Sequence, residues 1–195
     1  PEDRHYMAHL GRFYSVDKDN LEKALEYIDK SIELAEEQGS SDSILFHIKG
    51  MAYFRRIKIL TKEKANIDTI IEYAKLSSEC FKISRESDTQ INNEYPFVSH
   101  ARMLLTVLSY GKEIYHDIYS FIEQYKSDDF ITNIIDNIEN LISDFEVIRS
   151  KSDDFSDMKQ IKTDLLDLQG DIGKSLEILN NLLDKNLPEP ILFDF

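Results

Sequence analysis

The chain has 195 residues, enough for a single domain or a row of repeats with a shared core. Hydrophobic residues make up 42% and charged residues 31%, the composition of a folded globular protein rather than a disordered one. The net charge of −14 makes nucleic acid a poor candidate ligand, because such a surface repels phosphate backbones. With 6 glycines and 4 prolines, a turn-rich all-β fold and a Gly-rich phosphate loop are also disfavoured.

The sequence predicts neither a membrane span nor a secretion signal. No stretch is apolar for long enough to cross a bilayer, and the start, PEDRHY, has no signal-peptide pattern. The single cysteine, Cys80, fits a reducing compartment. We therefore expect a cytoplasmic protein with no membrane partner. Because the chain starts at Pro1 without a methionine, just before a helical pattern, we also expect it to be a piece of a longer protein.

Apolar residues recur at helical spacing along most of the chain and predict an all-α fold of about seven helices. Gly111 is expected to kink or divide the long fifth helix, because glycine is a common cause of helix kinks. The expected helices cover residues 3–14, 21–37, 42–60, 67–85, 97–125, 129–150 and 155–185.

Several helix ends have local sequence signals. The polar stretch 15–20 is expected to supply a turn and the N-cap of the second helix, and Gly39 to follow the last turn of that helix. Pro96 suits the first turn of the fifth helix. The string KSDDF occurs at 126–130 and again at 151–155, where a Ser or Asp cap and acidic residues at the positive helix end predict two helix starts.

The last expected helix, residues 155–185, has apolar residues at heptad spacing. It packs either against the sixth helix or, as a coiled-coil seam, against another chain, and the sequence leaves both open. Prolines predict an extended tail at residues 187–195. The apolar end of this tail either folds back on the body or leads into a further domain.

The first two hairpins share a glycine that is followed three residues later by a tyrosine. Gly11 and Tyr14 recur as Gly50 and Tyr53, with the two glycines 39 residues apart. A glycine at this place lets the next helix approach closely, and the aromatic ring fills the gap beside it. Together with neighbouring positions, these residues resemble the tetratricopeptide repeat. The matching residues are Met7, Leu10, Gly11 and Tyr14, then Ala24, Ile28 and Ser31, then Phe46, Gly50 and Tyr53, and more loosely Ile70, Ala74 and Ser77.

The resemblance implies tetratricopeptide-like antiparallel helix hairpins stacked into a short right-handed solenoid, with a long C-terminal helix. It covers residues 4–85, where Lys49 replaces the usual leucine and the closing proline of each unit is missing. For the domains, we expect two such hairpins in residues 1–93, a further helical hairpin and the long C-terminal helix in 94–186, and the extended tail in 187–195.

A narrower resemblance concerns the strings HYMAHLGRFYS, ALEYIDKSIEL and FHIKGMAYFRR. They are similar to the helical repeats that follow the nucleotide-binding core of bacterial STAND-type NTPases, which are antiviral proteins. In that family the repeats are the sensor that grips a phage protein, and the core then oligomerises. The resemblance implies a sensor segment of a larger, homo-oligomeric parent. The chain itself has no GxxxxGK[ST] phosphate-binding loop, so we expect no ATP hydrolysis by it.

In a tetratricopeptide array, side chains from the first helix of each hairpin line a concave groove. The resemblance therefore implies a protein partner in that groove. The mixture of aromatic and cationic side chains expected there suits protein contacts. The expected groove residues are His5, Arg12, His47, Met51, Phe54 and Arg55.

A cationic island, comprising Arg55, Arg56, Lys58, Lys62 and Lys64, stands out in the acidic chain. One interpretation is a solvated helix end, where cations suit the negative end of the helix dipole. The other is a patch for an acidic partner or a phosphate. The sequence leaves both open.

No group of residues has the pattern of a catalytic or metal site. His5 and His9 have the spacing of two zinc ligands on a helix, but no Glu or Cys between them completes a motif. Cys80 lies on an apolar helical face and is expected to be a buried structural thiol. We therefore expect a protein-binding segment that is not an enzyme and uses no cofactor. The alternative is that the helices after residue 94 form a regulatory or effector domain for a small ligand such as a nucleotide.

Overall fold

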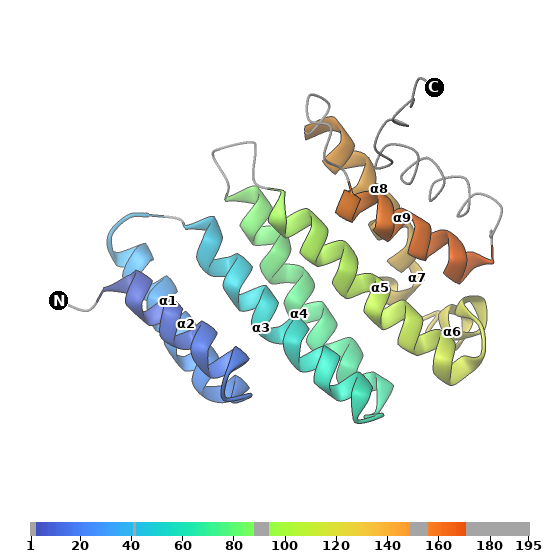
Figure 1. Cartoon of the computed structure of the whole chain (residues 1–195), viewed down its shortest axis with the longest axis horizontal. Helices are drawn as coiled ribbons and strands as arrows, with labels where there is room; N and C mark the ends of the chain where they lie inside the picture. The colour runs from blue at the N-terminus through green and yellow to red at the C-terminus, as the bar shows by residue number, and fades with distance from the viewer. Residues whose placement is uncertain (1–2, 41, 88–93, 149–155, 171–195) are drawn as a thin grey trace, which may run out of the picture.

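The computed structural model describes residues 3–40, 42–87, 94–148 and 156–170 (Figure 1). Within these residues every regular element is an α-helix, which confirms the all-α prediction. The described helices are α1 (Arg4–Val16), α2 (Leu21–Glu37), α3 (Ser43–Lys62), α4 (Ile67–Glu86), α5 (Tyr95–Tyr115), α6 (Ile118–Gln124), α7 (Asp129–Thr132), α8 (Ile134–Ile148) and α9 (Ser156–Gln169).

Successive helices pack as antiparallel hairpins in two layers (Figure 1). α1 packs along α2 and α3 along α4, and neighbouring hairpins are joined by contacts of α2 with α3 and of α4 with α5. α1, α3, α5 and α9 lie side by side in the front layer of Figure 1, where each contacts the next. The front layer is therefore built from the first helix of each hairpin, with α9 at its end.

Local signals for helix ends are confirmed wherever the structure describes them. Asn20 caps α2 through its side chain, within the stretch predicted to supply that cap. Gly39 follows α2 with a φ of 66°, a left-handed conformation that glycine adopts without strain. Pro96 lies in the first turn of α5, and Asp128 caps α7 at the first KSDDF string. The second string, at 151–155, lies outside the described residues.

The prediction of one helix over residues 97–125 is wrong, because α5 and α6 divide this region. α5 runs through Gly111, so the predicted division at that glycine is wrong as well. The chain turns at His116, whose backbone is left-handed with a φ of 74°. Asp117 then caps α6, because its carboxylate accepts hydrogen bonds from the Ser120 backbone N–H at 2.8 Å and hydroxyl at 2.5 Å. This cap starts a new helix although the apolar periodicity continues.

The predicted helix over residues 129–150 is also divided, into α7 and α8, with Asn133 between them. The Asn133 side chain donates to the Asp129 carbonyl at 2.9 Å, a bond to the backbone of the preceding turn that competes with helix continuation. Nine helices in the described part of the chain therefore replace the seven that were predicted.

The predicted long C-terminal helix, residues 155–185, is described only in part. α9 is that part, and Gly170 follows it with a φ of 83°. The remainder, residues 171–185, and the predicted tail, 187–195, lie outside the described residues.

Three glycines, Gly11, Gly50 and Gly111, allow paired helices to approach closely. A Cβ atom at each would lie less than 3.0 Å from a side chain of the facing helix, closer than real Cβ contacts come. The facing side chains are Ile28 at 2.4 Å, Phe81 at 2.8 Å and Phe121 at 2.3 Å, respectively. The close-approach role predicted for Gly11 and Gly50 is confirmed, and Gly111 has the same role in α5 against α6.

Serine hydroxyls tie the second helix of each of the first two hairpins to the start of the first. Ser31 donates to the Arg4 carbonyl at 2.6 Å, and Ser84 donates to the Ser43 carbonyl at 2.8 Å. The paired residues are 27 and 41 positions apart, because both helices of the second hairpin are about two turns longer at their connected ends. The counterpart of Ser31 is therefore Ser84, and the predicted match of Ser77 is wrong by two helical turns.

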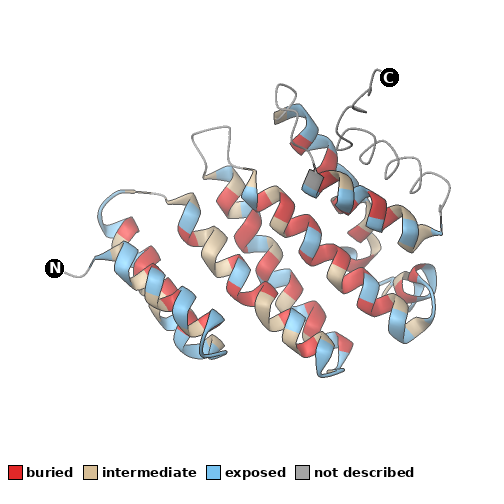
Figure 2. Cartoon of the chain, in the orientation of Figure 1, coloured by how far each residue is buried: buried red, intermediate tan, exposed pale blue. Residues whose placement is uncertain are grey.

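Buried apolar side chains form two clusters. The larger extends from α3 to α9 and includes Phe81 and Phe121, so the predicted domain boundary after residue 93 falls within the region that it covers. The smaller joins α1 and α2 to α3 through residues such as Ile28 and Leu45. In Figure 2, buried residues are dense along α4 and α5 and sparser along α1 and α2. The first hairpin therefore rests on a small core that it shares with α3.

We expect Gly11→Leu to loosen the first hairpin by about 2 kcal/mol, because the new side chain overlaps Ile28. Native-state hydrogen exchange should show faster exchange of amides in α1 and α2 and little change in α5, since the core of the first hairpin contains no residue of α5. Arg12→Leu, at the exposed neighbouring position, is the control. Unchanged exchange in α1 and α2 would contradict close packing at Gly11.

His100 of α5 is buried against α4 and holds the two helices together. Burial, and then the charge of Arg85, lower the pKa of His100 to about 3, so the ring is neutral. Nη1 of Arg85 lies 2.8 Å from Nδ1 of the ring, and because arginine can only donate, Nδ1 is the acceptor. The ring proton is therefore on Nε2, which donates to the Ser78 hydroxyl at 2.7 Å. Phe81 packs beside the ring, with 5.7 Å between ring centres.

Candidate binding groove

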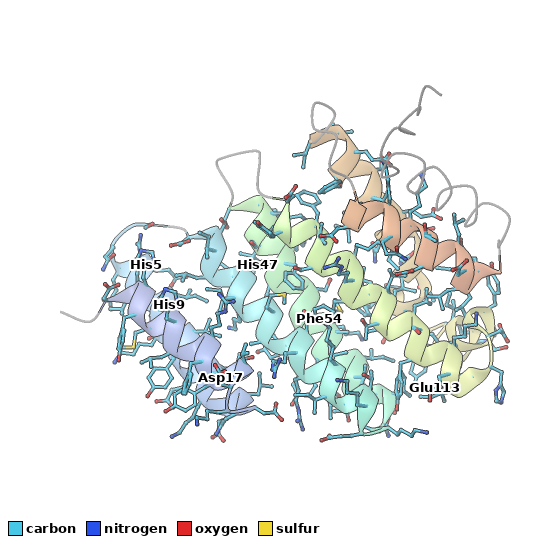
Figure 3. The ribbon with its side chains drawn as sticks, viewed as in Figure 1. His5, His9, Asp17, His47, Phe54 and Glu113 are labelled. Atoms are coloured by element: carbon cyan, nitrogen blue, oxygen red, sulfur yellow. The ribbon has the colours of Figure 1, made fainter. Side chains whose placement is uncertain are left out.

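A groove of about 880 Å³ lies between α3, α5 and α9. Lys58 and Lys62 of α3 and Lys64 of the following turn line one side, and Arg102 and Lys112 of α5 add two more cations. α9 contributes two carboxylates and a leucine to the lining. Phe54 and Glu113 also line the groove and are labelled on the front layer in Figure 3.

Helical spacing brings the groove side chains to one face of each helix. Lys58 and Lys62 lie one turn apart on α3. On α5, Arg102, Ser109 and Glu113 follow at steps of seven and four residues, which keep them on one side. The other sides of α5 are buried in the larger core. The groove face is therefore the polar face that remains when α5 packs into the fold.

The positive charges of the groove lie close enough to affect one another. Burial, followed by the charges of Arg102, Arg55 and Lys62, lowers the pKa of Lys58. The Lys58 ammonium lies 4.2 Å from the centre of the Phe54 ring, a cation–π contact. Five cations therefore gather with three carboxylates, Glu113, Asp164 and Asp167, in one groove of a chain whose net charge is −14.

The groove cations differ in how they are paired. Arg102 forms an ion pair with Asp157 of α9 at 2.6 Å, and Lys112 donates to the Leu168 carbonyl at 3.4 Å. These contacts tie α9 to α5 along the groove. Among the described residues, no carboxylate forms an ion pair with the three lysines Lys58, Lys62 and Lys64. We name these the free lysines, because none of them has an ion-pair partner among the described residues.

Three of the six residues predicted to line a groove lie on α3 near its packed face. Phe54 lines the groove, but its ring is only 2% exposed, so it forms the floor. His47 packs against Phe81 at 5.5 Å, and burial lowers its pKa to about 4. Arg55 donates to the Val16 carbonyl at 2.7 Å and so joins α3 to the end of α1.

The other three predicted residues are exposed and lie outside the groove. His5 and Arg12 are on α1, where Figure 3 shows His5 on the same side of the molecule as His47 and Phe54. Met51 of α3 is 36% exposed. The structure therefore brings one of the six, Phe54, into the groove, and a protein-binding role for the six residues stays a prediction.

The cationic island has features of both a helix end and a ligand-binding patch. Lys62 lies in the last turn of α3, as the helix-end interpretation requires. Lys58, Lys62 and Lys64 also line the groove, as a patch for a ligand would. Sequence reasoning missed Arg102 and Lys112, because each is a single cation in an apolar helix far from the island.

Other candidate chemistry receives no support from geometry. Cys80 is buried, as predicted, and burial raises the pKa of its thiol to about 11. In the part of the chain that the structure describes, no three His, Cys, Asp or Glu side chains gather as metal ligands would. None of the described helices is both long and apolar enough to span a bilayer.

Comparison with known proteins found no family model that matches the chain, no similar curated protein and no similar solved structure. The groove and the chemistry of its lining are therefore the features that bear on function.

Proposed function

We propose that this chain is a protein-binding helical scaffold whose groove holds an acidic segment of a partner. The observation that carries the proposal is the three free lysines, Lys58, Lys62 and Lys64, in one groove of a chain with a net charge of −14. Carboxylates of a partner would pair with these lysines. Such charge complementarity guides association and selects acidic sequences over basic ones.

In the wider setting, we propose that the scaffold is the sensor of a larger protein of the bacterial STAND type. This part of the proposal is supported by the resemblance of the repeat sequences alone. A phage protein bound in the groove would favour one conformation of the parent over another, and the parent would then assemble as a homo-oligomer. Binding is the whole contribution of this chain, which is not proposed to catalyse a reaction.

Selection of binders from a displayed peptide library tests the groove directly. Peptides that bind the full chain are expected to be enriched in Asp and Glu. Lys58→Glu/Lys62→Glu should weaken the selected peptides by about tenfold or more, because two attractive contacts become repulsive. Raising the salt concentration should weaken binding to the unaltered chain and have a smaller effect on the double variant.

Lys82→Glu is the matched control, because Lys82 is an exposed lysine of α4 outside the groove. It changes the net charge in the same direction as each groove substitution and should leave peptide binding within about twofold of the original. Enrichment of peptides without acidic residues, or equal effects of the groove and control variants, would contradict the proposal.

The second candidate function is binding of a nucleotide, and the same groove favours it. Lysine ammonium groups suit phosphate, and the Phe54 ring lies under Lys58 at the floor. A thermal-shift screen distinguishes the two functions. Saturable stabilisation by a nucleotide that is lost in Lys58→Glu/Lys62→Glu would favour the small ligand over the acidic peptide.

A further inference from the structure

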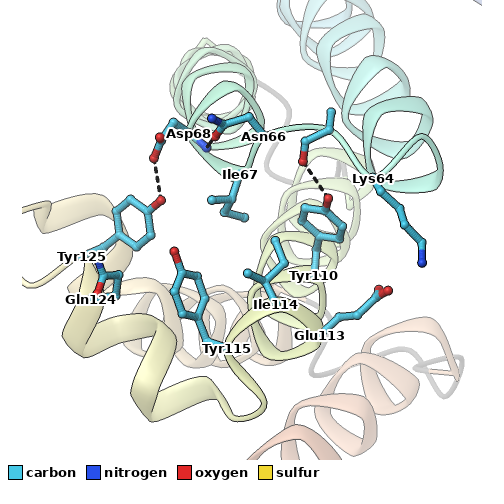
Figure 4. Close-up of a pocket in the computed structure, with 11 residues that line it drawn as sticks. Lys64, Asn66, Ile67, Asp68, Tyr110, Glu113, Ile114, Tyr115, Gln124 and Tyr125 are labelled. Atoms are coloured by element: carbon cyan, nitrogen blue, oxygen red, sulfur yellow. Dashed lines mark hydrogen bonds between the residues drawn. The ribbon is translucent and has the colours of Figure 1, made fainter.

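A second pocket, of about 680 Å³, lies where the turn between α3 and α4 meets the ends of α5 and α6 (Figure 4). Its lining includes Tyr110 and Tyr115 of α5 and Tyr125 at the end of α6. Asp68 of α4 and Glu113 of α5 add two carboxylates. We name this site the tyrosine pocket, and its walls combine aromatic rings with negative charge.

Two of the tyrosine rings form a corner. The ring centres of Tyr115 and Tyr125 are 6.2 Å apart, and the ring planes are inclined by 85°. Phe121 stacks on Tyr115 at 5.7 Å and meets the edge of Tyr125 at 5.4 Å, which holds both rings from the side of the core. The faces of aromatic rings attract cations through their quadrupole, so such a corner suits a positive group.

Hydrogen bonds already engage two of the three hydroxyl groups as donors. Tyr125 donates to Asp68 at 2.5 Å, and Tyr110 donates to the Ala65 carbonyl at 2.7 Å (Figure 4). Burial, and next the bond to Asp68, raise the pKa of Tyr125, which keeps its proton in place. Because their protons are used, these hydroxyls can offer a ligand only oxygen lone pairs. These two hydroxyls therefore suit a ligand group that donates hydrogen bonds.

The charged groups of the lining favour a cation as well. Asp68 and Glu113 are both exposed, and the single cation among the lining residues is Lys64. The pocket shares Lys64, Tyr110 and Glu113 with the groove described above. A segment that lies in the groove therefore reaches the tyrosine pocket along one continuous surface.

We propose that the tyrosine pocket binds an arginine or lysine side chain of the protein partner whose acidic segment lies in the groove. The identity of that partner rests on the proposed function, whereas the preference for a cationic side chain follows from the pocket itself. A guanidinium group fits best, because its planar donors can pair with the Asp68 carboxylate while its face stacks on a tyrosine ring.

N-acetyl-arginine amide, titrated into the full chain, is the probe for this site. NMR of the aromatic rings should show saturable shifts of the Tyr115 and Tyr125 signals. N-acetyl-citrulline amide has nearly the same shape without the charge, and it should bind at least about fivefold more weakly. Equal affinity for the two compounds, or no saturable shift of these rings with the arginine compound, would overturn the proposal.

Asp68→Asn tests the carboxylate, because it keeps an acceptor for the Tyr125 hydroxyl and removes only the charge. It should weaken the arginine compound by about threefold to fivefold. Tyr119→Leu is the control, since Tyr119 of α6 is 61% exposed and does not line the pocket. Affinity equal to that of the unaltered chain in Asp68→Asn would contradict the proposed ion pair.

Lys58→Glu separates this inference from the proposed function. The variant should lose affinity for acidic peptides and still bind the arginine compound with unchanged affinity, because Lys58 lines the groove and not the tyrosine pocket. Arginine binding without acidic-peptide binding would leave the pocket standing and remove the proposed function. Acidic-peptide binding without arginine binding would leave the proposed function standing and remove the tyrosine pocket as a cation site.

Discussion

Replacing Gly111 with leucine is expected to lower the free energy of unfolding by about 3 kcal/mol. A Cβ atom at this position would lie 2.3 Å from Cδ1 and 2.5 Å from Cγ of the Phe121 ring. The ring is fully buried, and Tyr115 stacks on it at 5.7 Å, so it has no free space into which to move. The overlap should therefore separate α6 from α5. Denaturant unfolding followed by circular dichroism measures the change.

A double-variant cycle identifies the cause of this loss. Phe121→Ala alone should cost about 3 to 5 kcal/mol, because it leaves a cavity. Gly111→Leu/Phe121→Ala should be at least about 1 kcal/mol more stable than the two single effects predict together, since the leucine then occupies space left by the ring. Ser109→Leu, at an exposed position of the same helix, should change stability by no more than about 0.5 kcal/mol. Strict additivity would contradict a direct overlap.

Lowering the pH from 7 to 4 is expected to cost about 3 kcal/mol of stability through His100 alone. The pKa of His100 is about 3 in the folded protein, against 6.5 without the effects of folding. Between these values the unfolded chain binds a proton that the folded protein does not. The free energy of unfolding therefore decreases as the pH falls through this range. In the folded protein, a charged ring would be buried beside Arg85, which donates to it.

Comparison with His100→Gln isolates this effect from the titration of carboxylates, which both proteins share. Between pH 7 and pH 4, the unaltered chain should lose about 2 to 3 kcal/mol more stability than the variant in denaturant unfolding. His116→Asn, at an exposed site, should keep the full acid sensitivity. Equal losses in the unaltered chain and His100→Gln would contradict a neutral, buried His100. His47 adds to the effect in the same direction, since its pKa is also lowered, to about 4.

Both predictions concern α5, the helix that contributes the largest share of the proposed binding surface. α5 presents Arg102 and Lys112 to the groove and Tyr110 and Tyr115 to the tyrosine pocket. His100 fixes the start of this helix on α4, and the glycine contact fixes its end on α6. Substitutions that loosen either end should therefore weaken ligand binding as well as stability.

Much of the fold could be predicted because its causes are local. Asn20 lies in a stretch with a readable capping signal, Gly39 follows a helix, and Pro96 starts one. The break before α6 also had a local signal, Asp117 followed three residues later by Ser120, but apolar periodicity across the break concealed it. Periodicity reports which residues face the core, and it continues when two helices face the same core.

The candidate site could be predicted only in part. Lys58 and Lys62 are visible as a cluster, since they lie on one helix. Arg102 and Asp164 meet them in the groove from positions forty or more residues away, and no sequence pattern joins these positions. The tyrosine pocket could not be predicted from the sequence for the same reason, because Asp68 and Tyr125 are 57 residues apart.

By itself, the sequence determined the helical class, the hairpin order at the start of the chain, most helix ends and the close-approach role of Gly11 and Gly50. These features depend on contacts within a few turns of one hairpin, so their causes are adjacent in the chain. The tertiary structure alone decided that Gly111 packs against Phe121 and does not divide α5, and that Ser84 is the counterpart of Ser31. It also decided that cations from α3 and α5 share one groove. These features depend on which helices lie side by side, and that is settled when separate apolar faces are buried together.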